Sequence, residues 1–147
     1  VIIDFKELAK FSEKTLYRMN FKIKNHLDEV KKTTADILKK LEALEINKRN
    51  YNHIRLAISE ALMNALEHGN KNDPKKNILI KGSISNRKIE VSVIDEGPGF
   101  DRSVLTYSEN QGDITHRGRG ITAIHACVDE IKYNDSGNGV TLIKYIV

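Results

Sequence analysis

A carboxylate and a carboxamide, Glu60 and Asn64, stand four residues apart in the stretch 56–70. At 100° per residue the two side chains lie about 40° apart on one side of a helix. Leu56 and Met63 flank that side, so the helix is expected to be apolar nearly all round. Burying an unpaired charge costs several kcal/mol, roughly, and the pair therefore needs partners. A bound cation with water and phosphate ligands would supply them.

A second candidate group follows an apolar strand pattern that ends at Asp95. The next residues include Gly97 and Gly99 on either side of a proline. The plain interpretation is a turn at the end of a strand. The alternative is that Asp95 accepts a hydrogen bond from an exocyclic amine such as that of adenine, while the two glycines let the backbone pass close to the base. This stretch alone leaves both interpretations open.

Two further glycine motifs lie near the C-terminus. Arg117–Gly120 has the sequence Arg-Gly-Arg-Gly and opens a helical pattern, where exposed N–H groups, the positive helix end and two arginines suit phosphate. Taken alone, it is more typical of a loop-to-helix turn with solvated arginines. The segment 137–141, Gly-Asn-Gly-Val-Thr, is on its own a hairpin turn.

The expected elements alternate between period-2 and helical patterns. A helix capped by Asn25 follows the first strand, and the central helix begins at Asn47 or Asn50 and ends in a left-handed stop at Gly69-Asn70. The expected segments, in chain order, are a short helix 2–11, a strand 17–24, helices 27–44 and 50–70, strands 78–84 and 89–95 joined by a hairpin, a helical turn 101–107, a polar loop 108–117, a helix 121–128, and strands 131–134 and 140–147. This order implies an α+β class, a two-layer sandwich whose mixed, mostly antiparallel sheet carries helices on one face.

Composition sets the bounds for function. The 147 residues form one domain, and no apolar run approaches the roughly 18 residues of a membrane span. The single cysteine, Cys127, excludes an internal disulfide, is expected to be buried in the core and is compatible with a reducing cytoplasm. The net charge of +4 is small, and the basic residues alternate with acidic ones, which disfavours direct nucleic-acid binding.

Together and in this order, the motifs resemble one superfamily. Glu60-x-x-x-Asn64, Asp95-x-Gly97-x-Gly99, Gly118-x-Gly120 and Gly137-x-Gly139-x-Thr141 are similar to the nucleotide-binding boxes of the GHKL, or Bergerat, ATPases, which include gyrase and the histidine kinases. The chain resembles, over residues 15–147, the small bacterial anti-sigma-factor serine/threonine kinases. The stretches that carry this narrower resemblance are Glu60-Ala-Leu-Met-Asn64-Ala, His68-Gly69-Asn70, Gly118-Arg-Gly-Ile and Val128-Asp129-Glu130-Ile131. The preceding residues 1–14 are then an N-terminal helical extension or linker.

The resemblance implies a role for each matching position. Glu60 would be catalytic, orienting or deprotonating the attacking hydroxyl, and Asn64 would ligate Mg²⁺. Asp95 would bind the adenine amine, with Thr141 in the same pocket. Residues 108–119 would cover the triphosphate. The residues implied to bind the ATP cofactor are Asn64, Asp95, Gly97, Gly99, Arg117, Gly118, Arg119, Gly120 and Thr141.

The implied function is that of an ATP- and Mg²⁺-dependent kinase. It would phosphorylate an anti-sigma antagonist of STAS type and sequester a sigma factor in the cytoplasm, with no membrane partner; members of this family often form homodimers. Two other hypotheses are a nucleotide-gated binding module without significant turnover and the catalytic domain of a larger signalling kinase. His116 stands where several family members have a lid arginine, which would shift the phosphate contact to Arg117. Val140 replaces a threonine that the family often has after the last glycine pair.

Overall fold

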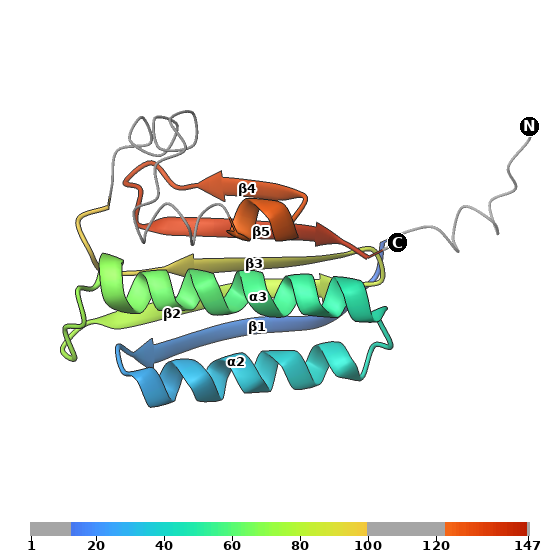
Figure 1. Ribbon diagram of the computed structural model, residues 1–147, viewed down its shortest axis with the longest axis horizontal. Helices are drawn as coiled ribbons and strands as arrows, with labels where there is room; N and C mark the ends of the chain where they lie inside the picture. The colour runs from blue at the N-terminus through green and yellow to red at the C-terminus, as the bar shows by residue number, and fades with distance from the viewer. Residues whose placement is uncertain (1–12, 100–122, 147) are drawn as a thin grey trace, which may run out of the picture.

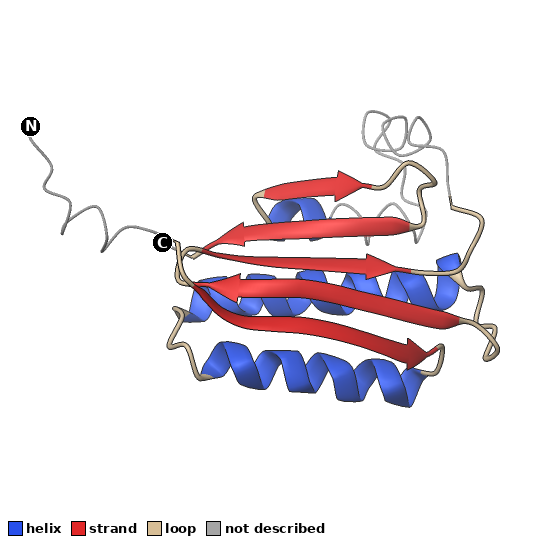
Figure 2. Ribbon diagram, turned by 180° about the vertical axis from the view of Figure 1, so that it is seen from behind, coloured by secondary structure: helices blue, strands red, loops and turns tan. Residues whose placement is uncertain are grey.

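The computed structural model describes residues 13–99 and 123–146 of the chain. Its sheet has five strands in the order β1-β2-β3-β5-β4, and every described strand pair is antiparallel. The helices lie on one face of this sheet (Figure 1), and the view from behind shows its other face uncovered by helices (Figure 2). The predicted α+β sandwich with helices on one face is confirmed.

The order of the elements also follows the prediction. In chain order they are β1 (Thr15–Lys24), α2 (Leu27–Glu42), α3 (Lys48–Asn64), a π-helical turn η1 (Ala65–Gly69), β2 (Asn77–Ser85), β3 (Lys88–Ile94), a short helix at 123–127, β4 (Glu130–Tyr133) and β5 (Gly139–Tyr145). The short helix expected at 2–11, the helical turn at 101–107 and the loop at 108–117 lie outside the described residues.

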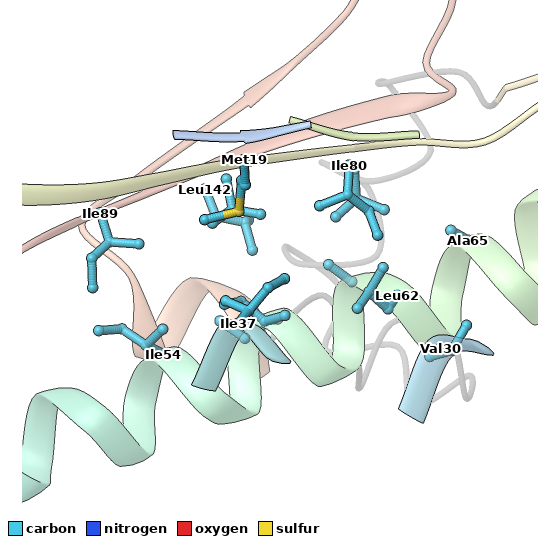
Figure 3. Close-up of a cluster of buried hydrophobic side chains, with 14 of the residues drawn as sticks. Met19, Val30, Ile37, Ile54, Leu62, Ala65, Ile80, Ile89 and Leu142 are labelled. Carbon is cyan, nitrogen blue, oxygen red and sulfur yellow. The ribbon is translucent and has the colours of Figure 1, made fainter. Parts of the chain in front are cut away.

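The core forms between the helices and the inner face of the sheet. Alternate strand residues such as Ile80 and Leu142 meet the apolar sides of the two helices, which include Ile37 on α2 and Leu62 on α3 (Figure 3). Leu62 is completely buried, at 0% exposure. Burying a leucine or isoleucine fully stabilises a fold by about 1.5–3 kcal/mol, so this layer holds α3 firmly on the sheet. Cys127 is buried in the same cluster, as predicted.

The start of α2 differs from the prediction. We expected Asn25 to cap the helix, but the cap is His26, whose Nδ1 accepts from the backbone N–H of Asp28 at 3.1 Å. Asn25 is buried instead, and its side-chain amide donates to the carbonyl of Leu66. An amide engaged with another element cannot also satisfy the N-terminal N–H groups of α2.

The end of the central helix also differs. The expected left-handed stop at Gly69-Asn70 is wrong, because Asn70 has helical backbone angles and the positive φ values fall on Lys71 and Asn72, at 53° and 59°. The helix widens into η1 before the chain reverses. Leu56 is 40% exposed, so α3 is less uniformly buried than we expected. No helix among the described residues is long and apolar enough to cross a membrane.

Candidate functional site

One end of the sandwich gathers most of the described candidate residues. The C-terminal end of α3 with η1, the end of β3 and the start of β5 meet there, at the left of Figure 1. They surround a hollow lined by Ala61, Asn64, Ala65, Gly69, Val93, Asp95, Tyr133, Gly137, Asn138, Gly139 and Val140. Three of the four predicted motifs therefore contribute to one site, although they are far apart in the sequence.

The helix presents its amide to this hollow. Asn64 is the last residue of α3, is half-buried and lines the hollow. Glu60 lies one turn earlier and is also half-buried, but it is not part of the lining. The spacing predicted from the sequence thus places Asn64 at the site and Glu60 one helical turn from it.

Asp95 is held by hydrogen bonds at both its backbone and its side chain. It follows the last residue of β3, and its N–H donates to the carbonyl of Asn138 at 2.9 Å. The N–H of Gly97 donates to Asp95 Oδ1 at 2.8 Å. The carboxylate is therefore held in a tight local turn while it lines the hollow, as an acceptor for a ligand amine requires.

Glycines allow the surrounding segments to touch. A Cβ on Gly69 would overlap the Asp95 carboxylate, and one on Gly97 would overlap the carbonyl of Gly69. Gly99 has a φ of 80°, and a Cβ there would overlap the carbonyl of Ser136. We predicted a close backbone approach at Gly97 and Gly99, and the described atoms that they approach belong to the protein itself.

The structure does not bring Thr141 into the hollow with Asp95. Its hydroxyl lies 2.7 Å from that of Ser92, its partner residue on β3. Val140, which pairs with Val93, lines the hollow instead. Because successive strand residues point to opposite faces, a residue beside Val140 cannot share its face, and this expectation is corrected.

A second, more polar hollow adjoins the first. It shares Gly69, Asp95 and Gly137 with the first hollow, and its other lining residues are His68, Lys71, Pro98 and Gly99. Lys71 brings an exposed cation that the sequence analysis did not select. Tyr133 and Asn138 were not selected from the sequence either. The motif around Gly137 and Gly139 could have indicated Asn138, whereas no pattern in the sequence marks Tyr133.

The arginine and glycine motif lies outside the described residues. This applies to Arg117, Gly118, Arg119 and Gly120, and also to His116 and the proposed cover at 108–119. Their expected contacts with phosphate remain predictions.

The donor set of the described site fits a nucleotide with a hard cation. Within residues 13–99 and 123–146, no three His, Cys, Asp or Glu side chains cluster as a metal site would require. Mg²⁺ commonly takes only one or two protein ligands and fills the rest of its shell with water and phosphate, which suits Asn64. Apolar walls from Ala61, Val93 and Val140 beside the Asp95 carboxylate suit a flat base with an amine.

The family follows from a comparison with known domains. The sequence model of the histidine kinase-like ATPase domain family matches residues 23–144, and the chain belongs to this family. The match covers every described helix and strand except the first eight residues of β1 and the last residue of β5.

The chain is also similar to individual proteins of known name. Over 101 residues the chain is 30% identical to the serine-protein kinase RsbW of Bacillus subtilis and to that of Listeria monocytogenes. The match covers 63% of this chain and 63% and 64% of those two proteins. An anti-sigma F factor of Clostridium beijerinckii is 25% identical over 96 residues, which are 63% of this chain and 67% of that protein.

A solved structure supports the fold. The crystal structure of the RsbU and RsbW domains of Rv1364c from Mycobacterium tuberculosis superposes with a TM-score of 0.60 at 20% identity. The superposition covers 88% of this chain and 32% of that one.

Proposed function

We propose that this chain is an ATP- and Mg²⁺-dependent protein serine/threonine kinase that acts as an anti-sigma regulatory factor. The observation that carries the proposal is that Asn64 and Asp95, from separate motifs, line a single hollow in a histidine kinase-like ATPase domain. The similarity to proteins named serine-protein kinase and anti-sigma F factor supports the activity. We assign the catalytic domain to residues 15–147, with residues 1–14 as its extension.

Each described residue has a distinct role in this proposal. The Asp95 carboxylate accepts a hydrogen bond from the adenine amine, and the apolar walls around it hold the ring. The Asn64 side-chain oxygen is a ligand of Mg²⁺, which neutralises charge on the phosphates when it is bound. Arg117 or Arg119 would add charge-assisted donors to the phosphate oxygens.

Glu60 supplies the proton chemistry. The hydroxyl of the substrate serine gives its proton to the Glu60 carboxylate while its oxygen bonds to the γ-phosphorus of ATP. The bond from that phosphorus to the bridging oxygen breaks, and ADP leaves. Phosphoryl transfer depends mainly on positioning and charge stabilisation, and the place of Glu60 one turn from Asn64 supports its assignment as the group that orients the hydroxyl.

The names of the relatives support the substrate and the target that we propose. We assign an anti-sigma antagonist of STAS type as the phosphorylated protein and a sigma factor as the sequestered one, both in the cytoplasm. A homodimer is the assembly that we expect. A nucleotide-gated binding module is the second hypothesis, and it is favoured by Val140, an apolar residue at a position where the family often has a threonine.

The test is transfer of labelled γ-phosphate from ATP to the antagonist protein, comparing wild type with Glu60→Gln. We expect at least a hundredfold loss of kcat, roughly the contribution of a positioned general base, with little change in ATP affinity. Glu29→Gln on the exposed surface of α2 is the control and keeps the wild-type rate. An unchanged rate in Glu60→Gln would refute the catalytic role. Nucleotide-dependent binding of the antagonist by a wild-type protein that transfers no phosphate would favour the second hypothesis.

A further inference from the structure

The peptide group between Asp95 and Glu96 is held from both sides by asparagine side chains. Its N–H, which belongs to Glu96, donates to Asn70 Oδ1 at 2.8 Å. Its carbonyl, which belongs to Asp95, accepts from Asn138 Nδ2 at 3.0 Å. Neither asparagine has a role in the proposed chemistry, and neither belongs to the motif of Asp95 itself.

Asn70 is anchored deep in the fold. It is fully buried, and its Nδ2 donates to Asn25 Oδ1 and to the carbonyl of Asn77, both at 3.0 Å. Its hydrogen bonds thus connect the loop after β3 to the β1–α2 corner and to the start of β2. Burying an amide costs free energy unless its polar atoms are paired, and Asn70 satisfies both amide hydrogens and its oxygen in this way.

Asn138 is anchored in the turn before β5. Its Oδ1 accepts from Asn134 Nδ2 at 2.7 Å, and its N–H donates to Asn134 Oδ1 at 3.0 Å. Its own carbonyl accepts the N–H of Asp95. The turn is therefore braced internally, and Asn138 contacts Asp95 at both its N–H and its carbonyl.

These contacts fix the orientation of the peptide that follows the Asp95 side chain. The glycines at 97 and 99 give the following loop wide backbone freedom, so the strand alone does not fix the Asp95–Glu96 peptide. The N–H of Gly97, which follows this peptide, donates to Asp95 Oδ1 at 2.8 Å. Hydrogen bonds weaken steeply when donor and acceptor are misaligned, so a rotated peptide would loosen the bond that holds the carboxylate toward a base amine.

We propose that Asn70 and Asn138 are positioning residues that set the preference of this site for adenine over guanine. The proposal rests on the function proposed above. Adenine offers an amine to the Asp95 carboxylate, whereas guanine offers a carbonyl oxygen at the same ring position and is repelled. A well-aimed carboxylate discriminates between the two bases, and a misdirected one does so less well.

The experiment measures Kd for AMP-PNP and GMP-PNP with Mg²⁺ by calorimetry, in wild type, Asn70→Ala and Asn138→Ala. We expect the ratio of the two affinities to fall about tenfold in each variant, roughly the effect of one hydrogen bond to a charged group. Asn52→Ala is the matched control, since Asn52 is exposed on α3 and takes no part in the hydrogen bonds that hold Asn70, Asn138 or the Asp95–Glu96 peptide. It should retain the wild-type ratio.

The outcomes separate this proposal from the proposed function. A wild-type protein that binds neither nucleotide overturns both. A wild type that prefers AMP-PNP, together with variants that keep its ratio, overturns the positioning role alone. Equal weakening for both nucleotides also overturns it, because that result indicates a structural role. If Asn70→Ala does not fold, Asn138→Ala in its half-buried turn decides the question.

Discussion

Gly69 lies where the helical layer comes closest to Asp95. A Cβ at this position would overlap both carboxylate oxygens and the carbon between them, and the carbonyl of Gly69 leaves no room for a Cβ on Gly97. Two glycines from separate motifs are therefore matched to each other. The contact places the acidic group directly against η1, which explains why Asp95 and Asn64 share one hollow.

Gly69→Ala is expected to weaken nucleotide binding by displacing the Asp95 carboxylate. We expect at least a tenfold rise in the Kd for AMP-PNP and a loss of stability of about 1–3 kcal/mol, typical of overpacking. Calorimetry and thermal unfolding measure the two effects.

Gly82→Ala is the matched control for that substitution. A Cβ on Gly82 would overlap the carbonyl of Glu90, so it also strains the fold, but that contact lies between β2 and β3 and does not involve Asp95. The control should lose stability. Its affinity for AMP-PNP, measured well below its melting temperature, should equal that of the wild type. Equal affinities for Gly69→Ala and wild type would show that the contact does not position Asp95.

At the scale of elements, α3 determines where the site forms. Its inner side packs on the sheet through Ile54, Ile58 and Leu62, which are each at most 2% exposed. The same helix carries Glu60 and Asn64 toward the end where β3 stops and β5 begins. The position of the amide therefore depends on how firmly the helix packs.

Leu62→Ala should destabilise the fold by about 2–5 kcal/mol, because it leaves a cavity in a fully buried layer. Leu56→Ala on the same helix is the control, since Leu56 is 40% exposed and its truncation should cost under about 1 kcal/mol. Urea unfolding of both variants measures the difference. Similar losses in the two variants would contradict the packing of α3 described here.

Regular periodicity accounts for what could be predicted at this scale. The alternation in β1 and β3 and the helical spacing in α2 and α3 identified the strands, the helices and the sandwich. The cap of α2 could not be identified, because Asn25 is the preferred cap by residue type and its side chain is engaged by the distant Leu66 and Asn70 instead. The end of α3 was missed for a similar reason, since a π-helical turn leaves no periodic signal.

In the site, too, the sequence predicted local motifs but not the contacts between distant residues. Asn64 and Asp95 could be selected because their motifs are short and ordered, and the structure brings both to one hollow. The prediction put Thr141 in the pocket, but its side chain points to the other face of the sheet. A shift of one residue along a strand is enough to reverse the face to which a side chain points. Asn70 and Asn138 act through contacts across 26 and 43 residues, which no local spacing indicates.

At the scale of the whole molecule, the antiparallel topology assembles the site. Ile94 at the end of β3 pairs with Gly139 at the start of β5, so the acidic loop and the glycine turn are adjacent although they are far apart in sequence. The antiparallel neighbour β2 begins at that same end, and Asn77 at its start is bound to Asn70. A ligand in the hollow would therefore connect helix, strands and turn, and its binding should stabilise the entire domain.

That linkage gives a prediction for thermal unfolding. ATP with Mg²⁺ at about 100 times its Kd should stabilise the native state by roughly 2.7 kcal/mol, which raises Tm by several degrees in a domain of this size. Asn64→Ala should abolish the part of the rise that depends on Mg²⁺, because the amide oxygen is the proposed ligand. Asn52→Ala, an exposed asparagine on the same helix, should behave as wild type. A rise that is unaffected by chelating Mg²⁺ or by Asn64→Ala would remove the metal role of Asn64, while leaving the nucleotide site on Asp95. No rise at millimolar ATP would mean that the matched glycines and the buried asparagines maintain an architecture whose binding function has been lost.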